Sequence, residues 1–139
     1  QRGRVQWNNC GRYPTYSFAV KRELVHKNNI TFSLLFGGGA KYSNGEDSLF
    51  LRDCLKSGMK VYRVPVLLGK ETARESTWFK GYNEKFFFDR GVLYHHLYGS
   101  LAKVMGIRWL IKHKEELCQE KSVKEAYGIV CQGIKEAKQ

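Results

Sequence analysis

Two adjacent carboxylates, Glu46 and Asp47, follow a glycine-rich stretch and open an amphipathic segment. Apolar residues then recur at helical spacing, at Leu51, Cys54 and Leu55. This pattern predicts a helix over 46–57. A carboxylate in the first turn of a helix lies near the positive end of the helix dipole, which favours its ionised form. The pair therefore either caps the helix or provides a fixed proton acceptor at the rim of a cleft.

The length and the net charge of the chain limit which kinds of function are possible. The 139 residues, of which 42% are hydrophobic, are about one domain's worth. The net charge of +11 permits nucleic acid, an anionic membrane surface or a phosphorylated small substrate as a partner. No apolar run reaches the ~20 residues that cross a bilayer. The four cysteines show no metal-site spacing, so we predict no metal site and expect free thiols in a reducing compartment.

Short elements alternate along the first half of the chain. Apolar residues at every second position predict strands, and Asn28 with Asn29 gives a turn signal. Pro65 cannot donate a ladder hydrogen bond, so the strand that contains it is expected at a sheet edge. The predicted elements are strands over 16–20, 30–32 and 60–68 and a short helix over 21–27.

The second half of the chain is predicted to be mainly helical. An aromatic connection over 69–88 comes first, and its residues 86–88 are expected to cover the edge of the sheet. A helical face starts at Asp89, and Ser122 with Glu125 forms a capping box for a final helix. Together these elements predict an α/β fold, in which a short mixed sheet is covered by C-terminal helices.

Two motifs, with a strand between them, resemble those of a known family. They are Gly45-Glu46-Asp47-Ser48-Leu49-Phe50-Leu51 and Arg74-Glu75-Ser76-Thr77-Trp78-Phe79-x-Gly81-Tyr82-Asn83-Glu84-Lys85, with Val61-Tyr62-Arg63-Val64-Pro65 between them. Residues 16–98 thereby resemble the second half of family 2 glycosyltransferases of the GT-A fold, of the type that serves bacterial polysaccharide biosynthesis. The resemblance implies that 1–98 is the C-terminal part of a catalytic domain and 99–139 a helical extension.

The resemblance implies an inverting transfer of a sugar from a nucleotide-sugar donor to a hydroxyl acceptor. Asp47 matches the family's catalytic base, which accepts the acceptor's proton late in the step and typically contributes ~10²–10⁴-fold. Glu46 would orient the acceptor or brace the loop. Gly45 would let the backbone approach the sugar without a Cβ clash.

Three residues of the second motif are candidates for substrate binding, and each has alternatives. Arg74 would hold phosphate oxygens of the donor in a bidentate way, or it pairs with Glu75 or Glu71 at the surface. Trp78 would stack on a sugar face, or it packs in the core. Tyr82 is a further candidate from the same motif.

The family's nucleotide-binding half and its Asp-x-Asp motif have no counterpart in residues 1–139. The resemblance therefore implies a preceding half that binds the nucleotide, with a divalent metal (Mg or Mn) whose ligands lie outside this chain. We expect residues 1–139 alone to bind a nucleotide-sugar weakly at most and to show no turnover. An open sheet edge predicts that the piece forms a homodimer, swaps an element or buries the edge under its own helices.

The expected partners are the donor and a sugar or lipid-linked acceptor, and no nucleic acid. The resemblance places the enzyme in the cytoplasm, with a peripheral position at the inner face of the membrane left open. A competing hypothesis is a basic, non-catalytic module for anionic polysaccharide, a membrane surface or nucleic acid, whose affinity would fall steeply with salt. A hydrolase built on Glu46 and Asp47 ranks last, because it lacks a second carboxylate pair.

Overall fold

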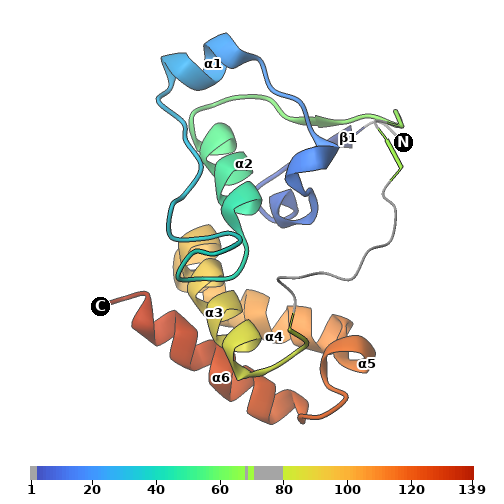
Figure 1. Cartoon of the computed structure of the whole chain (residues 1–139), viewed down its shortest axis with the longest axis vertical. Helices are drawn as coiled ribbons and strands as arrows, with labels where there is room; N and C mark the ends of the chain where they lie inside the picture. The colour runs from blue at the N-terminus through green and yellow to red at the C-terminus, as the bar shows by residue number, and fades with distance from the viewer. Residues whose placement is uncertain (1–2, 68, 71–79) are drawn as a thin grey trace. The chain divides into compact units, whose positions relative to one another are not determined.

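The computed structural model describes residues 3–67, 69–70 and 80–139, and the chain forms two compact units (Figure 1). The first unit is Gln1–Glu75 and the second is Ser76–Gln139. Helices predominate, and within the described ranges the sheet has two antiparallel strands. The fold is thus a helix-rich mixture of α and β structure.

The sheet of the first unit joins two segments that are far apart in sequence. Strand β1 (Gly3–Arg4) pairs with β2 (Tyr62–Arg63), so that Gly3 lies opposite Arg63. One step further along, the N–H of Val5 donates to the carbonyl of Val61 over 2.9 Å. Between the two strands the chain forms the 3₁₀ turns η1 (Cys10–Arg12) and η2 (Thr15–Ser17) and the helices α1 (Arg22–Lys27) and α2 (Glu46–Lys56).

Helix α2 supplies much of the core of the first unit and confirms the helix predicted over 46–57. Its apolar face buries Phe50, Leu51 and Cys54, which pack with Ile30, Val5 and Cys10. Phe18 and Val61 contact both of these groups, because they lie where the turn segment and the strand meet the helix. This packing fixes the first turn of α2 on a buried scaffold.

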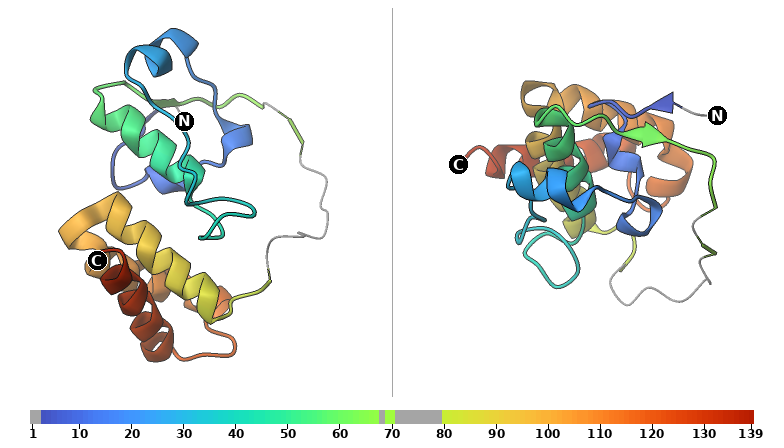
Figure 2. Two further views of the ribbon diagram at one scale, coloured as in Figure 1. Left: turned by 60° about the vertical axis from the view of Figure 1, so that its left-hand side comes forward. Right: turned by 90° about the horizontal axis from the view of Figure 1, so that it is seen from above.

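The second unit is a helical bundle, shown from two further sides in Figure 2. Its elements are α3 (Glu84–Tyr98), η3 (Gly99–Leu101), α4 (Ala102–Lys112), α5 (Lys114–Leu117) and α6 (Val123–Glu136). Helix α3 packs against both α6 and α4. A Cβ built on Gly133 would lie 2.0 Å from the carbonyl oxygen of Phe88, and one on Gly91 would lie 2.1 Å from that of Val130. Glycine at both positions therefore permits backbone contact between α3 and α6.

Local capping sets where the long helices begin. The side chain of Asn83 accepts the N–H of Phe86 over 2.9 Å, so α3 starts at Glu84, five residues before the predicted position. Ser122 and Glu125 form the predicted capping box: the Glu125 N–H donates to Ser122 Oγ, and the Ser122 N–H donates to Glu125 Oε2. The predicted final helix and its cap are confirmed.

The strand predictions were largely wrong. Residues 16–20 begin in η2 and continue as extended chain, 30–32 belong to no regular element, and within 60–68 only Tyr62–Arg63 is paired. Residue 68 lies outside the described ranges. An extended segment becomes a strand only when a neighbour pairs with it, and Pro65 removes one donor from this stretch. The described sheet is accordingly antiparallel rather than mixed.

Residues 86–88 were expected to cover a sheet edge, but they lie in the first turns of α3. Phe87 is fully buried, with Phe86 and Trp109 rings beside it, because the Asn83 cap starts the helix here. Helix α3, which the sequence analysis grouped with 1–98, packs with α4 and α6. The domain division at residue 98 rests on the family resemblance and stays a prediction. In the described ranges, no helix combines the length and apolarity needed to span a membrane.

Candidate functional site

Glu46 and Asp47 occupy the first turn of α2, directly after Gly45. Gly45 is the N-cap residue, and its φ of 123° is a backbone conformation that favours glycine. The N–H of Gly45 donates to Glu46 Oε2 over 3.0 Å. This hydrogen bond holds the Glu46 carboxylate against the loop that precedes the helix.

The glycine-rich loop before α2 is a hydrogen-bonded turn rather than an open, flexible segment. The N–H of Gly37 donates to the carbonyl of Tyr42 over 3.0 Å, and the rings of Phe36 and Tyr42, both buried, lie 4.9 Å apart. Gly37 has a φ of 120°, and a Cβ on it would lie 3.2 Å from the Glu46 carboxyl carbon. The glycine thus lets the loop rest directly on the Glu46 side chain, which fixes that carboxylate from a second side.

Asp47 is half-buried, and one of its oxygens is engaged. The N–H of Ser48 donates to Asp47 Oδ1 over 2.7 Å, and the Ser48 hydroxyl lies 3.5 Å from the same oxygen. Both of these contacts are made to Oδ1 rather than to Oδ2. A substrate proton would therefore be taken up at Oδ2.

Burial raises the pKa of Asp47, and the negative charge of Glu46 raises it further. The N–H of Ser48 acts in the opposite direction, as expected at a helix N-terminus, but burial is the larger effect. The position of Asp47 in the first turn of a helix predicted that its ionised form would be favoured, whereas the net pKa shift favours the protonated form. A carboxylate with a raised pKa binds a proton more strongly, which suits a general base.

Gly45, Glu46 and Asp47 lie together at the start of α2 in the first unit. Tyr82 belongs to the second unit, where its hydroxyl donates to Glu116 Oε1 and this bond raises the Tyr82 pKa. Its ring packs edge-on against Phe86. These contacts hold the Tyr82 side chain within the second unit, and its role in substrate binding stays a prediction. Arg74 and Trp78 lie outside the described residues.

The described part of the chain holds no group of three His, Cys, Asp or Glu that is arranged to bind a metal. The divalent metal that the resemblance implies therefore has no fitting ligand set among these residues.

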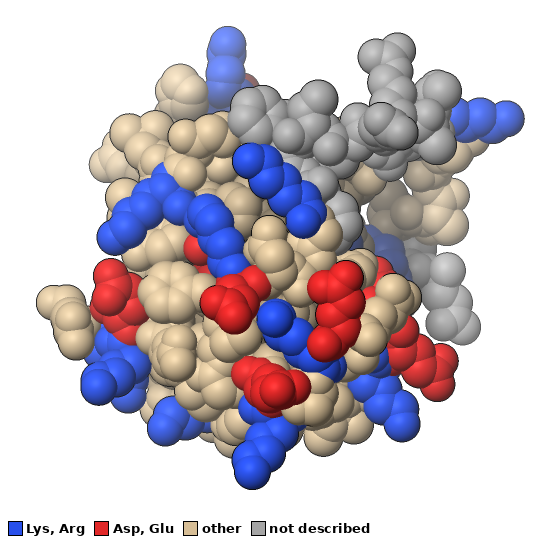
Figure 3. Space-filling view, turned by 60° about the horizontal axis from the view of Figure 1, so that its bottom comes forward, with Lys and Arg blue, Asp and Glu red and all other residues tan. Residues whose placement is uncertain are grey.

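Figure 3 shows one face of the molecule, on which Lys and Arg side chains are interspersed with Asp and Glu. The described ion pairs show the same mixing, with Lys85 at 2.6 Å from Asp89 and Lys121 at 3.9 Å from Glu84. Binding to nucleic acid or to an anionic membrane is favoured by basic residues concentrated on one surface. The face in Figure 3 has no unbroken surface of this kind.

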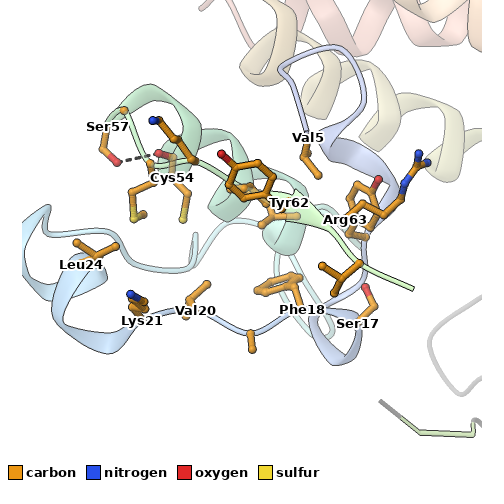
Figure 4. A pocket seen from close by; sticks show the side chains of 18 of the residues that line it. Val5, Ser17, Phe18, Val20, Lys21, Leu24, Cys54, Ser57, Tyr62 and Arg63 are labelled. Atoms are coloured by element: carbon orange, nitrogen blue, oxygen red, sulfur yellow. Dashed lines mark hydrogen bonds between the residues drawn. The ribbon is translucent and has the colours of Figure 1, made fainter. Parts of the chain in front are cut away.

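A groove of about 930 Å³ in the first unit was not predicted from the sequence (Figure 4). Residues 17–21, Leu24, Lys27 and Asn28 line one side and residues 57–64 with Val66 the other, with Leu51 and Cys54 of α2 also in its lining. Four cations belong to the lining: Lys21, Lys27, Lys60 and Arg63. The groove depends on how distant segments pack, but one signal was present, since Lys60 and Arg63 flank apolar residues in a segment predicted to lie at a sheet edge.

No protein-family model matches the chain, and neither a curated protein nor a solved structure matches it. The functional interpretation therefore depends on the geometry around Asp47 and on the two sequence motifs. The resemblance to family 2 glycosyltransferases is carried forward as a proposal.

Proposed function

We propose that this chain is the acceptor-side part of an inverting glycosyltransferase of the GT-A fold. The enzyme moves a sugar from a nucleotide-sugar to a hydroxyl group of a sugar or lipid-linked acceptor. Asp47 is the observation that carries the proposal: a half-buried carboxylate with a raised pKa, in the first turn of a helix and within the motif where the family has its base.

In the proposed reaction, the acceptor oxygen attacks the anomeric carbon from the side opposite the nucleoside diphosphate. The new C–O bond forms as the bond to the diphosphate breaks, and the acceptor's proton passes to Asp47 Oδ2. Attack from the opposite side inverts the anomeric centre. A base of raised pKa gains more from accepting the proton, so the burial of Asp47 assists the step.

Glu46 acts through Asp47 in this scheme and is a positioning residue. Its charge contributes to the raised Asp47 pKa, and its carboxylate is fixed by the Gly45 N–H and by contact with Gly37. The donor would be held chiefly by the preceding nucleotide-binding half. Arg74, near the diphosphate, and Trp78, against a sugar face, remain proposed contributions of this chain.

The test uses the complete enzyme, encoded together with whatever precedes residue 1. Release of nucleoside diphosphate is measured over a panel of nucleotide-sugars and acceptors. We expect Asp47→Asn to lower turnover by ~10²–10⁴-fold while donor affinity is unchanged, because the base acts only in the chemical step. Near-normal turnover of this variant would show that Asp47 is not the base.

Asp53→Asn is the matched control, because Asp53 lies on the same helix and pairs with Arg52 at 3.2 Å, away from the first turn. It removes the same charge from α2 and should keep turnover within about twofold, as expected for a surface substitution worth under ~0.5 kcal/mol. Equal losses in both variants would point to a general effect of charge on α2.

A further inference from the structure

Within the described ranges, the outer edge of β2 has backbone groups that no neighbouring strand pairs with. Because Val5 donates to Val61 and Gly3 lies opposite Arg63, the alternation of an antiparallel ladder turns the N–H and C=O groups of Tyr62 away from β1. In the part of the chain that the structure describes, no backbone hydrogen bond is made to Tyr62 from that side. The edge is therefore open to pairing.

The opposite wall of the groove is also extended chain. Phe18 has φ −139° and ψ 157°, which are β-strand values, and residues 18–20 make no backbone–backbone hydrogen bonds within the described ranges. Figure 4 shows Phe18, Val20 and Lys21 along one side of the groove and Tyr62 with Arg63 along the other. Two extended segments, residues 18–20 and β2, thus lie on opposite sides of the groove.

The groove is apolar at its base, and its walls expose large apolar side chains. Leu51 and Cys54 of α2 line it and are almost fully buried, whereas Val20, Val64 and Val66 are 46%, 53% and 62% exposed. Exposed apolar residues gathered in one place usually mark a binding surface. A ligand bound in the groove would bury these side chains against α2.

Among the residues that the structure describes, the charged side chains of the lining are all basic. Lys21, Lys27, Lys60 and Arg63 are exposed, and no Asp or Glu of the described ranges belongs to the lining. A partner with acidic side chains would complement this rim. An alkyl chain would fill the apolar base, but it would leave the peptide groups along both walls without hydrogen-bond partners.

We infer that this groove binds an extended polypeptide segment, which adds a strand between β2 and residues 18–20. Its apolar side chains face α2 and its acidic side chains meet the lysines and Arg63 at the rim. About six residues would span the wall formed by 61–66, since a strand rises ~3.3 Å per residue. Binding here does not require the proposed transferase activity. Main-chain hydrogen bonds supply affinity in this mode, and the alternating side chains supply specificity.

The test uses residues 1–139 and a fluorescently labelled hexapeptide that alternates glutamate with valine, with binding followed by anisotropy. The matched peptide has the same side chains and N-methylated amides at alternate positions, so it cannot pair along one edge. We expect it to bind at least about tenfold more weakly, because several hydrogen bonds are lost together. Equal binding of the two peptides, or no binding of the first, overturns the inference.

Charge reversal tests the rim. The double variant Lys21→Glu with Arg63→Glu should bind the glutamate peptide at least about tenfold more weakly and should bind a lysine–valine hexapeptide instead. Lys124→Glu with Lys135→Glu makes the same charge change on exposed positions of α6 and should bind as the wild type does. Circular dichroism verifies that both variants fold. The same loss of affinity in both double variants would show that only the net charge of the chain matters. Self-association of the chain that excludes the peptide would show that a second copy occupies the groove. Either result refutes the inference.

Discussion

Replacing Gly133 by alanine tests the packing of the helical unit most sharply. Gly133 lies in α6, and its added Cβ would stand 2.0 Å from the carbonyl oxygen of Phe88 and 3.0 Å from the N of Val92. Both neighbours are backbone atoms of α3, so neither can rotate away. The two helices must therefore separate, or the variant must lose its contact between α3 and α6.

The cost follows from this geometry. Real Cβ atoms essentially never lie under 3.0 Å from such a neighbour, so the backbones must move apart by about 1 Å. A gap of that size forfeits a quarter to a half of the dispersion energy across the contact. Overpacking of this kind costs ~1–3 kcal/mol and occasionally more, and alanine returns ~1 kcal/mol of helix propensity. With rigid backbone on both sides the overpacking cost lies at the upper end of that range, ~3 kcal/mol, so we expect a net loss of about 2 kcal/mol after the gain in helix propensity.

The assay is thermal and urea unfolding of residues 1–139, followed by far-ultraviolet circular dichroism. A loss of about 2 kcal/mol in a unit of this size should lower the midpoint temperature by ~8–16 °C. Gly128→Ala is the matched control, because Gly128 lies on the same helix and its Cβ would meet nothing within 4 Å. That variant should gain ~0.5–1 kcal/mol from helix propensity alone.

The comparison between Gly133→Ala and Gly128→Ala tests whether the backbones of α3 and α6 are in contact. If Gly133→Ala were as stable as Gly128→Ala, the backbones of α3 and α6 would not be in contact, and the described bundle would be wrong at its main interface. A loss at Gly133 with a gain at Gly128 supports the packing as described.

Further predictions concern the two capped helices and the core. Asp47→Asn should stabilise the first unit at neutral pH. Burial raises the pKa of Asp47 in the folded state, so the native state binds more protons than the unfolded state does. The stability of the wild type therefore falls as the pH rises from about 4 through that raised pKa. Amide exchange of α2 at neutral and acid pH should show a gain at neutral pH that shrinks on acidification; an equal gain at both would refute the assignment. Ser122→Ala should cost about 1 kcal/mol through loss of the α6 cap, and an unchanged urea midpoint would contradict it. Phe87→Ala should cost ~3–5 kcal/mol, because the ring is fully buried, and a loss under about 1 kcal/mol would place it outside the core.

Helices were predictable because their signals are local. The spacing of Leu51, Cys54 and Leu55 gave α2 to within a residue, and the Ser122–Glu125 pair gave the start of α6. Both patterns depend only on residues within a few positions of one another. The start of α3 was missed because the cap at Asn83 was not recognised inside an aromatic stretch.

Strands and the groove were less predictable because they depend on distant partners. Nothing near Tyr62 in the sequence indicates that its neighbour strand is Gly3–Arg4. Residues 16–20 alternate as a strand does, yet the described chain offers them no pairing partner. An added strand at the groove would supply one.

The candidate base, Asp47, shows the same contrast between features set by local sequence and features set by packing. Its position at the start of α2 was evident from the sequence, whereas the direction of its pKa shift was not. The helix dipole argument is local and favours the ionised form of Asp47. Burial depends on how the whole first unit packs around α2, and it shifts the pKa of Asp47 upward.

We propose that Asp47 accepts the proton during sugar transfer, and the turnover of the complete enzyme carrying Asp47→Asn, beside Asp53→Asn, at saturating donor and acceptor tests this most directly. We expect a loss of ~10²–10⁴-fold for Asp47→Asn alone, with donor affinity preserved. Turnover of Asp47→Asn within about threefold of the wild type would be too small a loss for a general base and would contradict it.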